Sequence, residues 1–234
     1  MNLQDKRIVV TGGSLGIGKT TAKLMIDKGA KVIITGRNKE RLESAANEIG
    51  AIPLVFDISD TSSIEEKANE CLSLLGGGID VLLNNAGIGE FALLGDLSID
   101  QFQRIFDTNV FGLAMLTQAF LPAFKEQQSG NIINIGSSAA IKGFAHGSVY
   151  AASKFAVRAM TQCWQAELRK DNIRVFLVNP SEVTTAFNQD SREEREAVSN
   201  KLTPLEIADI IIGGLELDNR GFVPETNIWA TNPF

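Results

Sequence analysis

Histidine, cysteine and tyrosine are scarce in this sequence of 234 residues, which contains one histidine, two cysteines and one tyrosine. Because His146 is the only histidine and neither cysteine has a ligand set beside it, we expect no metal site. Cys71 and Cys163 lie far apart and are interpreted as reduced thiols of a cytoplasmic protein, in preference to a disulfide or a pair of metal ligands.

Long hydrophobic runs and excess positive charge are also lacking. No stretch approaches the ~18–20 apolar residues of a membrane-spanning helix, and residues 1–6 lack the apolar core of a signal peptide. The formal net charge is −6 at pH 7 with histidine neutral, which disfavours a protein that coats nucleic acid or an anionic membrane. We therefore expect neither a nucleic-acid nor a membrane partner, although a local basic pocket is compatible with this charge.

Short apolar runs alternate with longer helical patterns along the chain, whose length suits one large α/β domain or two small ones. The strand candidates are residues 7–11, 31–35, 52–56, 81–84, 131–135 and 173–178, with an edge strand at about 226–229. The helix candidates are residues 17–28, 39–49, 63–75, 101–125 and 149–169. Near-continuous apolar strands alternating with helices predict a parallel sheet with right-handed crossovers, and so an open doubly wound α/β fold.

A polar segment, residues 188–200 (NQDSREEREAVSN), interrupts the apolar pattern before Pro204. One interpretation is a solvated helix or insertion. The other is a substrate lid over about residues 185–203, because ligands bind outside the carboxyl ends of parallel strands. The two interpretations are compatible with one another.

A glycine-rich turn follows the first predicted strand, with the sequence TGGSLGIG at residues 11–18. Gly12 permits a tight turn, Gly16 allows the backbone to approach a pyrophosphate, and Gly18 allows helix and strand to pack closely. Ser14 and Ile17 lie in the same turn, and the helix that follows offers free N–H groups to phosphates. Placed at the start of a βαβ unit, the turn predicts a dinucleotide site.

The end of the second predicted strand indicates which dinucleotide binds. NAD-selective sites usually carry a carboxylate here for the ribose diol, whereas this chain has Gly36 followed by Arg37. The guanidinium fork of arginine suits a 2′-phosphate. Arg37 can also be an exposed charge in a loop. Leu15 stands in the glycine turn where some NADP enzymes have a second basic residue. We predict NADP(H) as the cofactor, with NAD(H) as the second choice.

Five motifs together resemble the core short-chain dehydrogenases/reductases over essentially the whole chain. They are the glycine turn at 11–18, NNAG at 84–87, Asn109, Ser137 and the Tyr150-x-x-x-Lys154 pair. The resemblance implies a single-domain Rossmann-type doubly wound parallel sheet of about seven strands, spanning 1–234 with helices on both faces. It also implies a homodimer or homotetramer that pairs through helices 101–125 and 149–169.

The resemblance assigns Ser137, Tyr150, Lys154 and Asn109 to catalysis. A spacing of four places Tyr150 and Lys154 on one face of a helix. Acid–base work near neutrality needs the pKa of tyrosine, ~10 in water, to fall by roughly three units, and an ammonium and a positive nicotinamide both act in that direction. Ser137, thirteen residues before Tyr150, is preferred to Ser138 for holding the carbonyl oxygen.

Further roles follow from the same resemblance. Lys154 would also bind the nicotinamide ribose, and Asn109 would hold a water that passes protons to Lys154. His146 in a triad with Ser137 is a weaker alternative to a pocket-lining or loop histidine. The remaining expected cofactor contacts are Asp57 and Ile58 at the adenine, Asn85, Ala86 and Gly87 at the adenosine, and Pro180, Val183 and Thr185 at the nicotinamide.

Two of these positions are ambiguous. Asp57 can also be a plain turn residue, and Ser181 replaces the glycine that usually follows Pro180 in the family. The sequence predicts an NADP(H)-dependent oxidoreductase that interconverts a small-molecule carbonyl and a secondary alcohol, with Tyr150 as acid and base. A 3-ketoacyl-(acyl-carrier-protein) reductase is one alternative, disfavoured by the absence of a C-terminal Asp-Gly-Gly. A non-catalytic NADP-binding sensor or scaffold is another.

Overall fold

The computed structural model describes residues 1–187 and 193–233, which form one domain. Over these residues seven parallel strands make a single sheet in the order β3-β2-β1-β4-β5-β6-β7. The strands are β1 (Arg7–Thr11), β2 (Lys31–Gly36), β3 (Ile52–Val55), β4 (Val81–Asn84), β5 (Gly130–Ile135), β6 (Ile173–Pro180) and β7 (Glu225–Ile228). The expected doubly wound parallel sheet is therefore confirmed.

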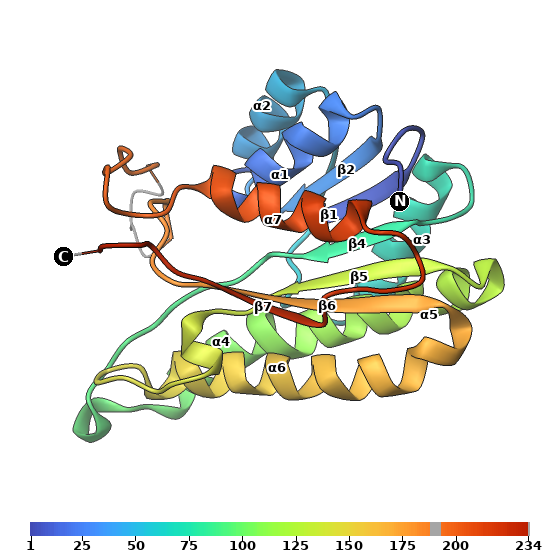
Figure 1. Cartoon of the computed structure of the whole chain (residues 1–234). Helices are drawn as coiled ribbons and strands as arrows, with labels where there is room; N and C mark the ends of the chain where they lie inside the picture. Colours follow the sequence, from blue (N-terminus) through green and yellow to red (C-terminus); the bar gives the residue numbers. More distant parts are fainter. Residues whose placement is uncertain (188–192, 234) are drawn as a thin grey trace.

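Helices cover both faces of this sheet. The longer ones are α1 (Gly16–Asp27), α2 (Lys39–Ile49), α3 (Ile64–Leu75), α4 (Ile99–Phe106), α5 (Leu113–Gln127), α6 (Ser148–Leu168) and α7 (Pro204–Glu216). The short ones are η1 (Leu94–Asp96), η2 (Asp107–Gly112), η3 (Ser138–Ala140) and η4 (Arg169–Asp171). In Figure 1, α1, α2 and α7 lie on one face, and α4, α5 and α6 lie on the other. No helix in the described part of the chain has the length and apolarity needed to cross a membrane.

Alternate residues of the strands supply the two halves of the core. Ile8 and Val10 of β1 pack toward α1, α2 and α7, whereas Val9 packs toward α3 and α5. All three side chains are fully buried. This is the pattern expected of a central strand covered on both faces, and it explains why the strands were recognisable as continuous apolar runs.

The predicted helices differ from the structure in two places: one is interrupted, and one helix was not predicted. The predicted helix 101–125 is interrupted by η2, a π-helical turn, so that α4 and α5 are separate elements. Gly112 ends this turn against Ile58, whose carbonyl oxygen would lie 2.2 Å from a Cβ on residue 112. The helix α7 was not predicted, although Thr203 and Glu206 form a capping box and Pro204 stands at its first turn.

The strand order reverses between β1 and β4, on either side of which the chain winds in opposite directions. In such a sheet the loops at the carboxyl ends of the strands diverge at this point and leave a crevice. The loops that follow β1, β4, β5 and β6 all reach the same edge of the sheet because the strands are parallel.

Candidate functional site

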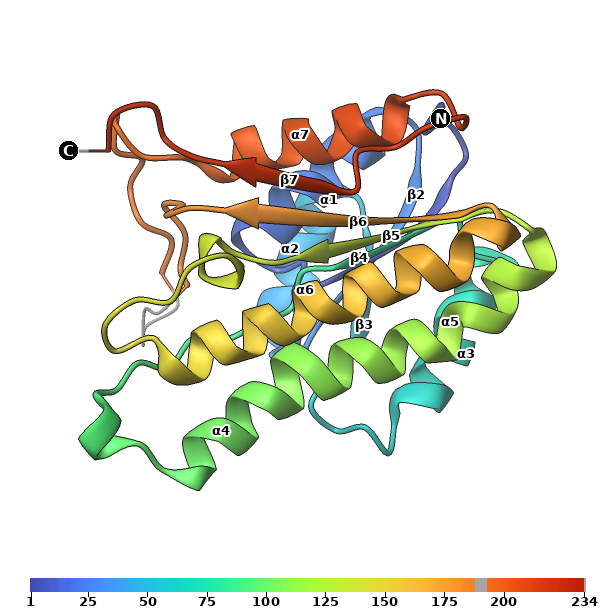
Figure 2. The same ribbon diagram turned by 60° about the horizontal axis from the view of Figure 1, so that its bottom comes forward.

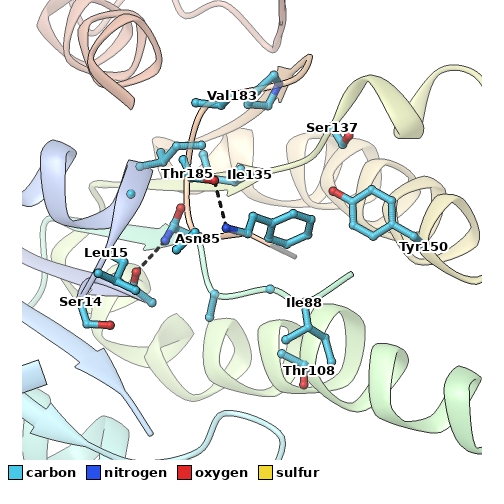
Figure 3. Close-up of a pocket in the computed structure, with 18 of the residues that line it drawn as sticks. Ser14, Leu15, Asn85, Ile88, Thr108, Ile135, Ser137, Tyr150, Val183 and Thr185 are labelled. Carbon is cyan, nitrogen blue, oxygen red and sulfur yellow. Dashed lines mark hydrogen bonds between the residues drawn. The ribbon is translucent and has the colours of Figure 1, made fainter. Parts of the chain in front are cut away.

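A pocket with a volume of about 660 Å³ lies at this edge. Most of the expected site residues line it. They are Gly12, Ser14, Gly16, Ile17, Arg37, Asp57, Ile58, Asn85, Ala86, Gly87, Ser137, Tyr150, Lys154, Pro180, Val183 and Thr185. Gly18 and Asn109 are not among the lining residues and lie behind the wall of the pocket. Figure 3 shows how Ser14 and Leu15 lie at one end of the pocket and Tyr150 at the other.

The glycine turn has a backbone that only glycine adopts readily. Gly12 and Gly16 have φ angles of +64° and +53°, in the left-handed region that a Cβ disfavours. Gly18 packs so closely on the turn that a Cβ there would lie 2.4 Å from the carbonyl oxygen of Gly12. The tight turn at Gly12 and the close packing at Gly18 are therefore present, whereas the expected role of Gly16 beside a pyrophosphate stays a prediction.

The loop after β4 fastens this turn. The Asn85 side-chain amide donates to the carbonyl oxygens of Thr11 and Gly12, at 2.9 and 3.0 Å. The Thr11 hydroxyl accepts from the backbone N–H groups of Asn85 and Ala86, each at 3.0 Å. Figure 3 shows Asn85 reaching back to the turn. The two loops are therefore held in one fixed relation.

Two arginines stand where the 2′-phosphate was expected. Arg37 follows β2, and its guanidinium lies 3.8 Å from the Asp57 carboxylate. Arg41 also lines the pocket, and its buried Nε has no hydrogen-bond partner in the described part of the chain. Asn38 caps the start of α2 by accepting a hydrogen bond from the Arg41 N–H at 2.8 Å. The sequence did not reveal Arg41 as a site residue, because the direction of its side chain depends on where α2 begins and runs.

Besides its ion pair with Arg37, the Asp57 carboxylate accepts two hydrogen bonds, both from Ser59. Its Oδ1 accepts from the backbone N–H of Ser59 at 3.0 Å and from the Ser59 hydroxyl at 2.8 Å. These are the bonds of an aspartate turn. Asp57 therefore shapes the loop after β3 and also lines the pocket.

Tyr150 and Lys154 lie on one face of α6, as their spacing predicts. The Lys154 ammonium lies 5.8 Å from the centre of the Tyr150 ring and donates to the Ile135 carbonyl oxygen at 2.9 Å. Burial raises the pKa of Tyr150, while the neighbouring Ser137 hydroxyl acts in the opposite direction. Burial lowers the pKa of Lys154 to about 8. The phenol of Tyr150 is directed toward Ser137 in Figure 3.

The loop that carries Ser137 is fixed by a residue that sequence reasoning missed. The Asn179 side chain, fully buried, accepts a hydrogen bond from the Ser137 N–H at 3.2 Å. It donates to Glu225 and Asn227 of β7, each at 3.0 Å. The Ser137 hydroxyl caps η3 by accepting from the Ala139 N–H at 3.1 Å. Ser138 also lines the pocket, but the hydroxyl that favours a lower pKa of Tyr150 is that of Ser137.

Asn109 lies in the π turn η2 and is fully buried. Its side chain accepts from the Ile88 N–H at 2.9 Å and donates to the Ile88 carbonyl at 2.9 Å and to the Ser153 hydroxyl at 3.1 Å. Ser153 in turn donates to the Tyr150 carbonyl at 2.7 Å. Asn109 thus connects the loop after β4 to the turn of α6 that carries Tyr150. Single π turns inside helices are frequent at functional sites.

The comparisons with known proteins agree with this arrangement. The sequence model described as short chain dehydrogenase matches residues 6–196. The chain belongs to the short-chain dehydrogenase/reductase family. An oxidoreductase of Staphylococcus aureus (strain MW2) is 33% identical over 233 residues, which cover 97% of each protein.

Two solved structures are similar to this chain. An alcohol dehydrogenase of the archaeon Thermococcus sibiricus, complexed with 5-hydroxy-NADP, has a TM-score of 0.89 at 28% identity and covers 97% of each chain. A metagenomic short-chain oxidoreductase in complex with NADP has a TM-score of 0.84 at 30% identity, covering 97% of this chain and 98% of that chain. The family, its Rossmann fold and its class as oxidoreductases are thereby established for this chain.

Around this family site stand three phenylalanines that sequence reasoning did not single out. Phe91, Phe144 and Phe187 all line the pocket and come from the loops after β4, β5 and β6. The Phe91 and Phe187 rings lie 5.5 and 5.8 Å from the Tyr150 ring, centre to centre. Aromatic residues in loops that follow parallel strands were the available signal, but their directions depend on the loop conformations.

The segment expected to form a lid is described only in part, because residues 188–192 lie outside the described residues. On its near side, Thr185, Ala186 and Phe187 line the pocket. On its far side, Arg195 also lines the pocket and pairs with Glu182 at 3.3 Å. The chain beyond returns to the body through hydrogen bonds between Thr184 and Leu202.

His146 takes no part in this pocket. It is exposed, has a φ of +66°, and its carbonyl accepts from the Ala92 N–H at 2.9 Å. The residue is a loop histidine, one of the two expected outcomes. What the arrangement offers chemically is a buried phenol beside a second hydroxyl and an ammonium, at one end of a pocket that begins with a glycine turn.

Proposed function

We propose that this protein transfers hydride between NADP(H) and a carbonyl–secondary alcohol pair, with Tyr150 as the acid and base. The observation that carries the proposal is the position of the Tyr150 phenol, beside Ser137 and one helical turn from Lys154. A phenol that donates a proton to a carbonyl oxygen needs a second donor to hold that oxygen and a nearby cation to favour the phenolate left behind.

The residues present fit NADP(H). Gly12 and Gly16 have no side chain in the turn that a pyrophosphate would approach, and their positive φ angles disfavour a residue that has one. Arg41 has a buried Nε without a partner in the described chain, and Arg37 is mostly exposed and only loosely paired with Asp57. These two guanidinium groups suit a 2′-phosphate, which NAD(H) lacks. Similar structures that hold NADP or its 5-hydroxy derivative support the same choice.

When bound, the nicotinamide supplies hydride to the carbonyl carbon or accepts it from the alcohol. In reduction Tyr150 donates its proton to the carbonyl oxygen, and the Ser137 hydroxyl donates a hydrogen bond to the same atom. Lys154 stabilises the resulting phenolate and, with a pKa of about 8, exchanges protons near neutrality. We assign to the η2 turn around Asn109 the water through which solvent reprotonates Lys154.

The test is NADPH oxidation by the purified protein, followed by absorbance with ketones, aldehydes, hydroxy-acid partners and a pantetheine-linked 3-ketoacyl substrate. We expect turnover with a free ketone or aldehyde and a preference for NADPH over NADH. A higher rate with the pantetheine thioester would favour 3-ketoacyl reduction. Binding of NADPH without turnover of any substrate would support the sensor or scaffold alternative.

Assembly, location and the lid belong to the same proposal. Phe111, Met115 and Phe155 are exposed on η2, α5 and α6, which favours burial of these side chains in a homodimer or homotetramer. Figure 2 shows α5 and α6 on the face turned toward the viewer. Sedimentation measures the assembly. We further propose a cytoplasmic location, which the two free cysteines support, and a lid over about residues 185–203, which the lining position of Arg195 supports.

A further inference from the structure

The aromatic wall, defined as Phe91, Phe144 and Phe187, surrounds the reacting end of the pocket. Tyr150 lies between Phe91 and Phe187, and Phe144 continues the wall 6.0 Å from Phe91. Phe91 and Phe144 are 41% and 50% exposed although they stand beside a buried phenol. Large apolar side chains that remain open to solvent around a reactive group are surface that an apolar ligand would cover.

The charges of the pocket lie elsewhere. The lining residues from the loops after β4 and β5 are all uncharged: Asn85, Ala86, Gly87, Ile88, Phe91, Gly136, Ser137, Ser138, Ala139 and Phe144. Of the lining cations nearest the reacting end, Lys154 is buried and donates to Ile135, and Arg195 is paired with Glu182. A substrate carboxylate placed beside Tyr150 would lose water without gaining an unpaired cationic side chain as a partner. It would also oppose formation of the phenolate.

We propose that the substrate is a neutral ketone or aldehyde whose carbonyl bears an apolar group of aryl size, which packs on the aromatic wall. The inference deepens the proposed function and rests on it. Aryl groups fit this wall because offset and edge-to-face ring contacts at the observed spacing add to the burial of apolar area. Keto acids and hydroxy acids are the class that the same wall rejects.

Three methyl ketones of graded side chain test the proposal: 4-phenyl-2-butanone, 2-butanone and 4-oxopentanoate. We expect kcat/KM to fall from the first to the second by about tenfold or more, because the phenyl group supplies the contacts with the wall. We expect the keto acid to be the poorest of the three. A keto acid that matches or exceeds the phenyl ketone would overturn the inference.

A binding measurement separates this inference from the proposed function. The inert amide 3-phenylpropanamide is titrated calorimetrically into the protein loaded with NADP+, with succinamate as the charged counterpart. Binding of the phenyl amide alone supports the aromatic wall even if no ketone is turned over, in which case the proposed function fails by itself. Equal binding of both amides, or binding of neither, contradicts the wall as a recognition surface.

Substitutions locate the effect. In Phe91→Ala and Phe187→Ala we expect kcat/KM for the phenyl ketone to fall about tenfold and that for 2-butanone by less than about threefold. Phe91→Leu should recover part of the loss. Leu94→Ala is the matched control, because Leu94 follows in the same loop, is 83% exposed and does not line the pocket. Equal losses for both ketones would instead indicate a structural role.

A second inference comes from the opposite end of the pocket. The Glu194 carboxylate accepts a hydrogen bond of 2.8 Å from the Gly16 N–H, although the two residues are separated by 178 positions. Gly16 opens α1, whose preceding residue Leu15 provides no side-chain cap and whose first turn contains no acidic residue. The N–H groups at such a helix start attract anions, and here they are the groups expected to bind a pyrophosphate.

We also infer that Glu194 competes with the cofactor pyrophosphate for the glycine turn and so weakens cofactor binding. Two anions cannot share one N–H group, and the carboxylate must leave before a phosphate oxygen takes its place. The bond therefore lowers the affinity for the cofactor by the free energy needed to break it. This inference depends on the dinucleotide site but not on the reaction that takes place there.

Calorimetric titration of Glu194→Gln with NADP+ tests the competition. We expect the Kd to fall about fivefold relative to the natural chain, because a neutral amide is a weaker competitor. Inorganic pyrophosphate is a second probe and should also bind more tightly. Glu196→Gln removes the same charge two residues away and should leave both Kd values within about twofold. An unchanged or higher Kd in Glu194→Gln, or equal decreases in both variants, would overturn the competition.

Discussion

The two ends of the pocket are constructed differently. At the nucleotide end, function depends on backbone: Gly12 and Gly16 adopt positive φ angles, and Asn85 holds the turn through its side-chain amide. At the end where we propose that substrate binds, side chains form the surface: the aromatic wall stands on three loops and is partly open to solvent. Backbone geometry restricts residue types strongly, whereas a loop side chain can be exchanged with little effect on the fold. The nucleotide end should therefore tolerate substitution least.

The proposed catalytic residues lie at the substrate end, but they are held by hydrogen bonds as the glycine turn is. Ser137 is held by Asn179, and Tyr150 is connected through Ser153 to Asn109. Gly136 is required by the same packing, because a Cβ there would lie 2.0 Å from the Asn179 side-chain oxygen. A reactive group held in this way retains its geometry when the neighbouring substrate loops vary.

Tyr150→Phe is expected to give the largest effect. The substitution removes the proton donor while the ring and its contacts remain, so we expect kcat to fall about 1,000-fold or more. The Kd for NADPH should change by less than about threefold, because the phenol lies at the opposite end of the pocket from the glycine turn. Steady-state kinetics and a fluorescence titration of NADPH measure the two quantities. Substantial remaining activity would mean that another group donates the proton.

Gly18→Ala tests the rigid end of the comparison. A Cβ at residue 18 would lie 2.4 Å from the Gly12 carbonyl oxygen and 2.5 Å from the Asn85 amide nitrogen, so the turn must shift. We expect the free energy of unfolding to fall by about 1–3 kcal/mol and the Kd for NADPH to rise more than about tenfold. Urea denaturation and titration provide the measurements.

Gly213→Ala is the matched control, since Gly213 lies within α7 and a Cβ there meets nothing within 4 Å. It should raise stability by about 0.5–1 kcal/mol through helix propensity. If the two alanines have equal effects, close packing does not explain Gly18.

The same contrast explains what could be predicted from the sequence. Strands such as β1 and β4 were recognisable because buried parallel strands are continuous apolar runs. The glycine turn was recognisable because its backbone requires glycine at fixed spacing. The π turn η2 was not, since it depends on a contact between Gly112 and Ile58 that is distant in sequence. The capping box of α7 was present in the sequence, so that helix was within reach of prediction.

Within the site, the motif residues were predictable and their neighbours were not. Ser137, Tyr150 and Lys154 come together through a strand end and one helix face, both of which follow from spacing. Arg41 was missed because only the observed path of α2 brings its Nε to the pocket. Phe91 was missed because no periodicity determines how a loop turns a ring. Their assigned roles remain predictions that kinetics must test.

Arg41→Gln examines a charged side chain at the nucleotide end. Loss of the guanidinium, whose buried Nε has no hydrogen-bond partner among the described residues, should raise the KM for NADPH about tenfold. It should leave the KM for NADH within about threefold, because only NADPH carries the 2′-phosphate. Initial rates with both cofactors measure the ratio. Arg220→Gln is the control, since that side chain is 92% exposed and does not line the pocket. Equal increases for both cofactors would place Arg41 outside phosphate selection.

Lys154 should give the smallest effect, one that appears in the dependence of stability on pH. Its pKa of about 8 in the folded protein lies below the ordinary lysine value of 10.5. Between these two values Lys154 binds more protons in the unfolded chain than in the folded one, so its contribution to the free energy of unfolding should rise with pH, by at most about 1.4 kcal/mol per pH unit. Cys71, whose pKa burial raises to about 12, contributes in the opposite direction and is the same in both proteins compared. Below pH 8 both states hold the proton, and Lys154 adds no slope. Lys154→Met should remove this rise, which urea denaturation between pH 7 and about 10 would measure. An identical slope in the two proteins would mean that the ammonium is not held away from water, and that the rigid centre of the site is more open than its packing indicates.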